Sequence, residues 1–281
     1  MRVFQCGRYS LSLAKPLVMG IVNVTPDSFS DGGRYHSVER AVAHAQDLID
    51  AGADILDVGG ESTRPGAAPV SVEEELARVI PVVEQLASLN MPVSVDTRKP
   101  EVMAAAIAAG ASMINDVTGF SDPKAQAIVA EAEVGVCVMH MQGTPETMQK
   151  NPHYHDVVAE VSDYLANQAE ILKTAGVEAH RIAIDPGFGF GKTLTHNLQL
   201  LRGIKQLCEL GYPVLIGVSR KSMIGQITGR TVTERMVGSV VAALLAVQQG
   251  AHILRVHDVA QTRDMLAVWH AYHDSLECHE S

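Results

Sequence analysis

The sequence predicts an α/β protein, a single-domain (βα)8 barrel of the TIM type, and three observations support this prediction. Eight short runs rich in Val, Ile and Leu alternate with eight longer segments of helical periodicity along the chain. None of the short runs alternates cleanly between polar and apolar residues, which is typical of parallel strands covered on both faces. No segment has the composition of an interdomain linker, so we expect one domain over residues 1–281.

The expected strands are the short apolar runs at residues 17–22, 54–58, 92–95, 112–115, 134–139, 181–184, 213–218 and 252–256. The expected helices are residues 38–51, 72–88, 100–109, 125–133, 157–175, 197–210, 233–249 and 262–276. Eight strands, each followed by a helix, is the count of a (βα)8 barrel. Hairpin or doubly wound arrangements remain alternatives, but the even alternation to the end of the chain favours a closed barrel.

A weak internal repeat marks the joints between helix and strand. The segments AGADILDVG (51–59), AGASMINDV (109–117) and QGAHILRVHDV (249–259) share one order of features. In each, a Gly stands where a helix would end in a left-handed cap, a buried strand follows, and the strand exit is polar.

Two long loops follow the first two expected strands. The stretch MGIVNVTPDSFSDGG (19–33) leaves its strand at Asn23 and then consists of turn-forming residues until helical periodicity begins near Ser37. The segment GESTRPGA (60–67) has a similar composition with one Arg. Most βα connections are shorter, and longer ones tend to be binding loops, so we expect both to close over a substrate.

Composition excludes several classes of function. The hydrophobic fraction of 47% and the charged fraction of 19% are typical of a globular protein with a large core. A net charge of −10 and only 4% aromatic residues argue against a nucleic-acid partner or an anionic membrane surface. The chain has no apolar run long enough to span a membrane, no signal peptide and no CxxC spacing among its four cysteines, so we expect a cytoplasmic protein.

Polar residues stand at or just after the end of every expected strand. They are Asn23; Gly59, Gly60 and Glu61; Asp96; Asn115 and Asp116; His140; Asp185; Ser219, Arg220 and Lys221; and His257 and Asp258. Because the carboxyl ends of barrel strands meet at one mouth, where catalysis takes place, we expect these residues to form one site.

The residue types divide this site into parts. Asp96, Asn115 and Asp185 are acceptors suited to a heterocycle with adjacent N–H donors. Asn23 is a neutral oxygen ligand suited to Mg²⁺, which usually keeps few protein ligands and takes others from substrate phosphates. The groups suited to phosphate or carboxylate are cationic, or nearly so: Arg64, Arg220, Lys221, Arg255 and His257.

Some of these residues have structural alternatives. Capping of the following helix is the alternative for Asp96, and we expect Asp258 to cap the last helix and Asp116 to be structural. Arg255 stands inside a strand between Leu254 and Val256, so a purely structural role would require a buried partner. The histidines outside the strand exits are expected at the surface: His153, His155, His270, His273 and His279.

The glycine-rich segment DPGFGFGKT (185–193) resembles a phosphate-binding loop only superficially. A P-loop needs a Gly six residues before its Lys, and Pro186 stands there. We expect the glycines to let the backbone and the rings of Phe188 and Phe190 approach a flat ligand.

Taken together and in order, eight segments resemble the dihydropteroate synthases of folate biosynthesis, and specifically the enterobacterial type. They are MGIVNVTPDSFSDGG, DVGGESTRPGA, SVDT, NDV, MHMQGTP, DPGFGFGK, GVSRKSMIG and RVHDV. The resemblance runs from Met19 to about Asp264, and the departures are confined to helices and the N-terminal segment.

The resemblance implies a homodimeric transferase that joins the pyrophosphate ester of 6-hydroxymethyl-7,8-dihydropterin to p-aminobenzoate and releases pyrophosphate. It also implies competition by sulfonamides and a role for Mg²⁺ bound at Asn23. Asp96, Asn115, Asp185 and Lys221 would hold the pterin ring, with Asp96, Asp185, Lys221 and Arg255 as the catalytic set. The pyrophosphate would be held by Thr63, Arg64, Arg255 and His257, and p-aminobenzoate by Phe29, Pro65, Phe190, Lys221 and Ser222.

Two other functions remain as alternatives. A methyltetrahydrofolate–corrinoid methyltransferase would share the pterin contacts, but it needs neither the Asn23 site nor an arylamine pocket, and the TPDSFSDGG and SRKS segments argue against it. A non-catalytic pterin-binding barrel would not need the full set of Asn23 and rim cations.

Overall fold

A computed structural model describes residues 2–24, 34–62, 69–145 and 147–277. Its centre is an eight-stranded parallel sheet in the order β8-β7-β6-β5-β4-β3-β10-β9. A bridge between Ile184 and Val214 joins the two ends of this order, so the sheet is nearly closed into a barrel. The strands are β3 (Leu17–Asn23), β4 (Ile55–Gly59), β5 (Val93–Asp96), β6 (Met113–Asp116), β7 (Gly135–Met139), β8 (Ile182–Asp185), β9 (Leu215–Ile216) and β10 (Ile253–Val256). The predicted barrel is confirmed.

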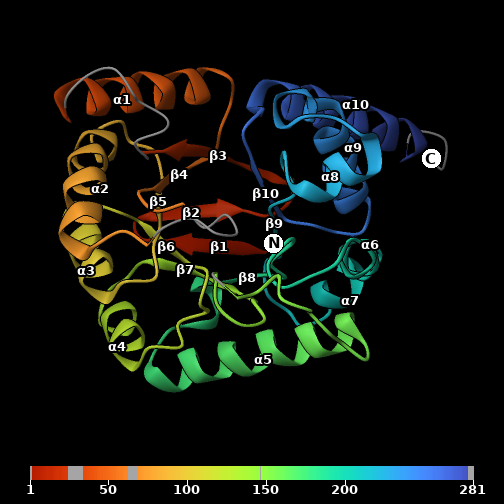
Figure 1. Cartoon of the computed structure of the whole chain (residues 1–281). Helices are drawn as coiled ribbons and strands as arrows, with labels where there is room; N and C mark the ends of the chain where they lie inside the picture. Colours follow the sequence, from red (N-terminus) through yellow and green to blue (C-terminus); the bar gives the residue numbers. More distant parts are fainter. Residues whose placement is uncertain (1, 25–33, 63–68, 146, 278–281) are drawn as a thin grey trace.

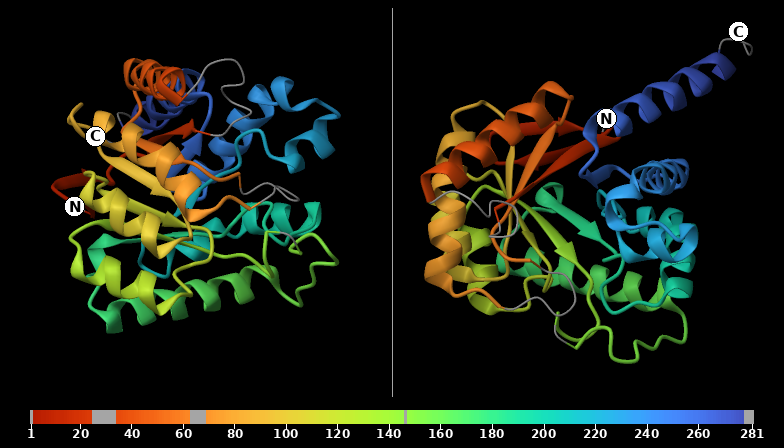
Figure 2. Two further views of the ribbon diagram at one scale, coloured as in Figure 1. Left: turned by 60° about the vertical axis from the view of Figure 1, so that its left-hand side comes forward. Right: turned by 45° about the horizontal axis from the view of Figure 1, so that its top comes forward.

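Helices surround the strands as a ring (Figure 1). They are α1 (Arg34–Asp50), α2 (Val72–Ala87), α3 (Pro100–Ala108), α4 (Pro123–Glu131), α5 (Val157–Ala175), α6 (Leu194–Arg202), α7 (Ile204–Cys208), α8 (Ser222–Thr228), α9 (Met236–Gln248) and α10 (Val259–Glu277). The end of α10 projects beyond the rest of the molecule in the right-hand view of Figure 2. None of the described helices is both long and apolar enough to cross a membrane.

The helix ends follow local sequence signals. Ser71 begins α2 by accepting a hydrogen bond from the Glu74 backbone, and Asp156 caps α5 in the same way at the backbones of Val158 and Ala159. Such caps stabilise a helix by about 0.5–2 kcal/mol. Gly176 ends α5 in the left-handed conformation that glycine adopts without strain.

The structure contains an N-terminal hairpin that the sequence did not predict. Strands β1 (Val3–Cys6) and β2 (Tyr9–Ser12) pair antiparallel and lie across the barrel in Figure 1. Phe4 and Cys6 are fully buried in one cluster with the inward side chains near the amino ends of the barrel strands, among them Met19 and Ile55. A fully buried aliphatic or Phe side chain contributes about 1.5–3 kcal/mol, so the hairpin closes this end with a dry core.

Two predictions for the outer ring are wrong in detail. The segment 197–210, predicted as one helix, is divided at Gly203 into α6 and α7. A Cβ at Gly203 would lie 2.6 Å from the Val158 side chain, so close packing on α5 explains the glycine. The short helix α8 was also absent from the predicted set, because seven residues are too few for periodicity to be visible.

The pleat of the strands sorts the barrel interior into layers. Ile55, Met113 and Ile253 belong to the apolar cluster above the hairpin, and two residues further along the same strands stand Asp57, Asn115 and Arg255. Because side chains two apart share one face of a strand, these polar groups point into the same barrel above the apolar layer.

Candidate active site

The carboxyl ends of the strands bring most of the predicted residues to one mouth. Asn23 and Gly59 are register partners, as are Gly59 and Asp96, and Asp96 and Asn115. β10 pairs with β3 on the side opposite β4 and carries Arg255. Phe29, Thr63, Arg64 and Pro65 lie outside the described residues.

Arg255 is held by two carboxylates inside the barrel. Its Nε donates to Asp57 Oδ2 at 2.6 Å, and its Nη2 donates to Asp96 Oδ2 at 2.9 Å. The structure therefore gives Arg255 the buried partners that its position in a strand required. It also directs Asp96 to Arg255, and α3 begins after Lys99 with no side-chain cap.

Asp57 is a site residue that sequence reasoning missed. Its side chain is fully buried in the middle of β4, away from any strand exit. A signal was present, because a carboxylate within an otherwise apolar strand run requires a buried cation, and Arg255 within β10 required a buried anion.

The buried charges perturb one another. Burial raises the pKa of Asp96 to about 7, and the Asp57 charge adds to this rise while Arg255 opposes it. Burial disfavours the charge on Arg255, but Asp57 and Asp96 more than offset this effect and raise its pKa. Arg255 thus stays cationic, whereas Asp96 titrates near neutral pH.

Several acceptor atoms in this layer have no hydrogen-bond partner among the residues that the structure describes. They are Asp57 Oδ1, Asp96 Oδ1 and Asn115 Oδ1. Leaving a buried acceptor unpaired costs about 1–3 kcal/mol, so a ligand that supplies donors here gains this free energy. A flat heterocycle with adjacent N–H groups has the required chemistry.

Asp185 and Lys221 form the opposite wall. Asp185 is buried, and its Oδ1 accepts a hydrogen bond from the Gly187 backbone at 2.7 Å. Burial raises the pKa of Asp185, and Lys221 opposes the rise. Burial lowers the pKa of Lys221 to about 8, against the pull of Asp185. Lys221 Nζ donates to the Phe188 carbonyl and lies 4.5 Å from the centre of the Phe190 ring.

The glycines of residues 185–193 serve a different contact from the one predicted. Phe188 is fully buried in the main core, so its ring does not face a ligand. A Cβ at Gly187 would lie 1.9 Å from the His140 carbonyl oxygen, and one at Gly191 would lie 2.7 Å from the Gln142 carbonyl oxygen. These glycines let the β8 exit pack against the β7 exit, and Phe190 alone keeps the predicted role.

The exits of β9 and β10 are joined by side chains. Arg220 binds Asp258 with two hydrogen bonds, from Nε at 3.0 Å and from Nη2 at 2.6 Å. Arg220 is therefore paired within the protein, contrary to its predicted availability for an anion. Asp258 stands just before α10, where a cap was predicted, and its carboxylate accepts from Arg220. Ser219 Oγ lies 3.0 Å from His257 Nδ1.

Asp116 has the structural role that was expected. Its carboxylate accepts hydrogen bonds from the backbones of Thr118 and Phe120 and from the Thr118 hydroxyl, at 2.8–3.0 Å. Glu61 is likewise occupied, since it accepts from Arg98 at 3.2 Å and from Lys99 at 2.7 Å. His153, His155 and His273 are exposed as predicted, but His270 is half-buried beside Trp269, and His279 lies outside the described residues.

Asn23 is the candidate metal ligand. It is half-buried at the end of β3, and its side-chain amide makes no hydrogen bond to any residue that the structure describes. In the same ranges, no three His, Cys, Asp or Glu side chains gather to hold a metal ion. One neutral oxygen at the rim fits Mg²⁺ when phosphate oxygens and water supply the remaining ligands.

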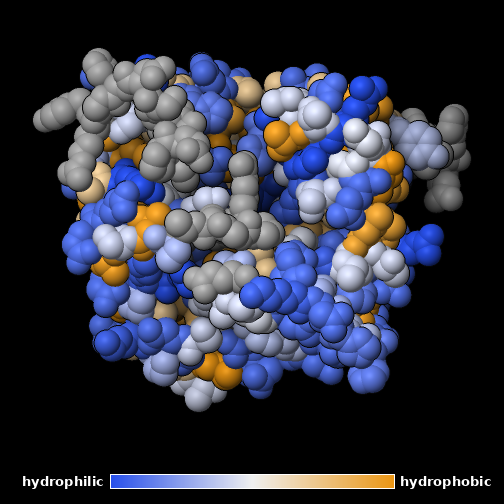
Figure 3. All heavy atoms as spheres, viewed as in Figure 1, coloured by the Kyte–Doolittle hydropathy of each residue, from blue (hydrophilic) through white to orange (hydrophobic). Residues whose placement is uncertain are grey.

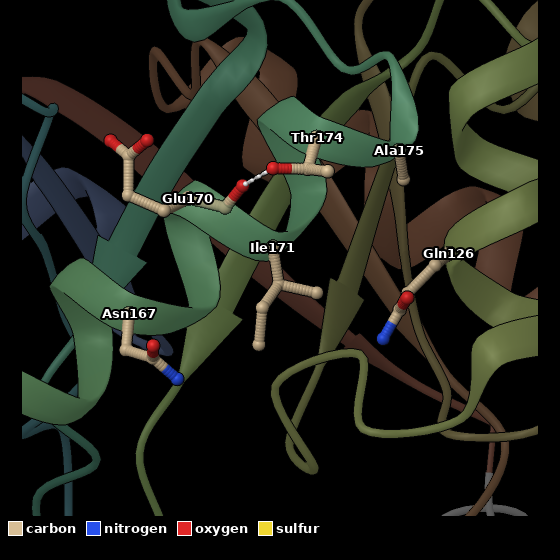
Figure 4. A pocket seen from close by; sticks show the side chains of 6 residues that line it. All are labelled: Gln126, Asn167, Glu170, Ile171, Thr174 and Ala175. Carbon is tan, nitrogen blue, oxygen red and sulfur yellow. Dashed lines mark hydrogen bonds between the residues drawn. The ribbon is translucent and has the colours of Figure 1, made fainter.

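A second cavity, of ≈ 410 Å³, lies on the outside of the barrel between α4 and α5. Figure 4 shows its lining, in which Gln126 faces a row of α5 side chains: Asn167, Glu170, Ile171, Thr174 and Ala175. Thr174 donates to the Glu170 backbone oxygen at 2.9 Å. Only one charged group lines this cavity, so the barrel mouth is the better candidate for chemistry.

The chain is similar to known proteins over most of its length. A family model described as "Pterin binding enzyme" matches residues 19–257. The dihydropteroate synthase of Neisseria meningitidis serogroup C is 54% identical over 274 residues, which cover 96% of this chain and 97% of the relative.

Two solved structures are similar over nearly their whole length. A dihydropteroate synthase of Xanthomonas albilineans with 4-aminobenzoic acid has a TM-score of 0.91 and 56% identity, covering 96% of this chain and 98% of the other. That of Yersinia pestis in complex with a sulfonamide drug has a TM-score of 0.92 and 45% identity, covering 97% and 99%.

Proposed function

The chain belongs to the pterin-binding enzymes, among the dihydropteroate synthases, and from this premise we propose how its residues divide the work of the reaction. It condenses 6-hydroxymethyl-7,8-dihydropterin pyrophosphate with p-aminobenzoate to give 7,8-dihydropteroate and pyrophosphate. The observation that supports this division best is the meeting of Asp96, Asn115 and Asp185 with Lys221 and Arg255 inside one barrel mouth.

The pterin ring occupies the buried layer. Its amino and ring N–H groups donate to the carboxylate and amide oxygens of Asp96, Asn115 and Asp185, whose unpaired or half-used acceptors match these donors. Lys221 donates to the acceptor edge of the ring. Because the ring replaces missing partners, binding removes the cost of leaving these groups unpaired.

The chemical step begins with the bridging C–O bond. It breaks with its electron pair leaving on pyrophosphate, and the conjugated dihydropterin spreads the positive charge left at the methylene carbon. The buried carboxylates of Asp96 and Asp185 stabilise this cation in surroundings where water is scarce. The arylamine nitrogen, unprotonated at neutral pH, then forms the C–N bond and loses one proton to solvent.

Cationic groups at the carboxyl end of the barrel balance the negative charge of the pyrophosphate leaving group. His257 and Arg255 are placed at and just below the exit of β10, and the Nη1 of Arg255 makes no hydrogen bond to the described residues. With Thr63 and Arg64 they bind pyrophosphate. Asn23, together with phosphate oxygens of the substrate, would hold Mg²⁺, and the bound ion would supply positive charge to neutralise the leaving group.

The arylamine site lies beside Lys221. The Phe190 ring over Lys221 forms one wall, and Ser222, the first residue of α8, is exposed next to it and binds the carboxylate of p-aminobenzoate. The resemblance assigns Phe29 and Pro65, which lie outside the described residues, to the same site. Sulfonamides, which resemble p-aminobenzoate, compete for this site, as the Yersinia pestis complex supports.

The chain also acts as a homodimer in the cytoplasm. Val237, Val241 and Leu245 are exposed at spacings of four along α9, which gives one apolar stripe on one helix face. Cys6 and Cys137 are buried free thiols, as expected for a reducing compartment.

A direct assay tests this function. Purified protein is incubated with the dihydropterin pyrophosphate, Mg²⁺ and labelled p-aminobenzoate, and we expect labelled dihydropteroate and pyrophosphate in equal amounts, with turnover lost in EDTA. A parallel incubation with methyltetrahydrofolate and a corrinoid tests the alternative. Methyl transfer without labelled dihydropteroate would replace the proposed function.

A further inference from the structure

Lys192 is a buried lysine that has no role in the reaction steps described above. Its residue is 3% exposed, and its Nζ has three acceptors: His140 Nδ1 at 2.9 Å, the Phe190 carbonyl at 2.9 Å and the His140 carbonyl at 3.4 Å. An ammonium group has three hydrogens to donate and no acceptor. The three acceptors around Nζ can therefore accept one hydrogen bond each from a charged lysine.

His140 is an acceptor in this arrangement. It lies at the exit of β7 and is 7% exposed, with its ring edge-on to Tyr164 at 4.9 Å. Burial, together with the Lys192 charge, lowers the pKa of His140 to about 3, so its ring is neutral. Lys192 therefore joins the β7 exit to the β8 exit through its hydrogen bonds to His140 and to the Phe190 carbonyl, although burial lowers the pKa of its amine.

The loop between β8 and α6 is held at three successive carbonyl groups, two of them by side chains from other loops and one by its own Lys192. Lys221 donates to the Phe188 oxygen, Gln149 donates to the Gly189 oxygen at 2.5 Å, and Lys192 donates to the Phe190 oxygen. Asn197 accepts from the Gly189 backbone N–H at 2.8 Å. The orientation of Phe190 over Lys221 depends on this set.

We propose that Lys192 is a positioning residue for the arylamine site: its bonds to His140 and to the Phe190 carbonyl hold the Phe190 ring over Lys221, where p-aminobenzoate binds. This inference rests on the proposed function, because it assigns Phe190 to the p-aminobenzoate pocket. Lys192 itself does not touch either substrate.

If Lys192 only stabilised the fold, its substitution would affect the two substrates differently from a positioning role. Lys192 is close enough to Asp185 for their charges to interact, so a lysine that merely supported the barrel would affect pterin binding and arylamine binding alike. A positioning role through Phe190 affects p-aminobenzoate selectively. The KM values for the two substrates separate these cases.

The test compares Lys192→Met with Lys192→Gln, which keeps a donor for one carbonyl. We expect Lys192→Met to raise the KM for p-aminobenzoate about tenfold or more, while the dissociation constant of a pyrophosphate-free pterin changes less than about threefold. Lys192→Gln is expected between wild type and Lys192→Met. Lys205→Met, at an exposed lysine of α7, is the matched control and should leave both values unchanged.

The measured KM for p-aminobenzoate and the measured pterin affinity can each overturn the inference. An unchanged KM for p-aminobenzoate in Lys192→Met, or an equal loss of pterin binding, would overturn it. If Lys192→Met does not fold, His140→Leu, which has no side-chain acceptor, gives the same comparison with one bond removed, and absence of the selective effect there would also overturn the inference. Wild type without activity would instead refute the proposed function, on which the inference depends.

Discussion

The Arg255 guanidinium forms ion pairs with two carboxylates, Asp57 and Asp96. Burial raises the pKa of Asp96 to about 7, Arg255 opposes this rise, and the fully buried Asp57 on the Nε side of Arg255 adds to it. Below that pH Asp96 is neutral and no longer stabilises a cation. We therefore expect kcat/KM for the pterin substrate to fall as the pH decreases through about 7.

Asp57→Asn tests this coupling at the same scale. The Asp57 charge raises the pKa of Asp96, and Arg255 lowers it, so removing Asp57 leaves Arg255 as the stronger influence. The acid limb of the pH–rate profile should move to lower pH. A limb that stays in place or moves upward in Asp57→Asn would show that Asp57 does not act through Asp96. Asp264→Asn, at an exposed position on α10, is the control and should leave the profile unchanged.

At the residue scale the sequence predicted which side chains meet but not how they pair. Strand exits converge by topology, so Asp96, Asn115, Asp185 and Lys221 could be assigned in advance. The pairing of Asp57 with Arg255 and of Arg220 with Asp258 depends on the register between strands. Register between distant strands is a tertiary property that no local pattern states.

At the element scale, the β8 exit loop is fixed by close packing against β7. Gly187 and Gly229 both have left-handed backbones, with φ of 68° and 71°, but only Gly187 has an atom near its missing Cβ. Gly229→Ala should cost about 1 kcal/mol of unfolding free energy from backbone strain alone. Gly187→Ala adds a clash with the His140 backbone and should cost more than about 3 kcal/mol.

Urea unfolding of the two glycine variants measures this difference directly. Equal costs for Gly187→Ala and Gly229→Ala would mean that the loop moves away from His140 without penalty. The predicted packing of the two exits would then be wrong.

The elements themselves were largely predictable, for a physical reason. Parallel barrel strands are buried on both faces and appear as apolar runs, and the eight runs found in the sequence correspond to β3–β10. The hairpin of β1 and β2 was missed because four-residue strands give little periodicity. The break at Gly203 was missed because it depends on Val158 from another helix.

At the scale of the whole molecule, apolar side chains are not spread evenly over the outer surface. Figure 3 shows apolar side chains on the face over α8–α10, and the exposed apolar residues of this region include Val237, Val241 and Leu245 on α9 and Val268 on α10. Exposed apolar patches of this kind mark protein–protein interfaces. This location could not be predicted from the sequence, because the neighbouring helices determine which face of α9 is covered.

Val241→Glu tests whether the proposed dimer forms through this face. A charge within a buried apolar interface costs several kcal/mol, so sedimentation should change from dimer to monomer at micromolar concentration. Leu89→Glu, at an exposed position after α2, should remain dimeric. A Val241→Glu variant that sediments as wild type would exclude the α9 stripe as the contact.

We propose that buried carboxylates stabilise a cation formed when the pterin–pyrophosphate bond ionises. This proposal can be tested by an α-secondary deuterium isotope effect, measured with deuterium on the reacting methylene under conditions where chemistry limits turnover. Ionisation loosens bending at that carbon before the arylamine attacks, so we expect a clearly normal effect, greater than unity. An effect near unity would contradict it, because it would mean that the arylamine displaces pyrophosphate directly.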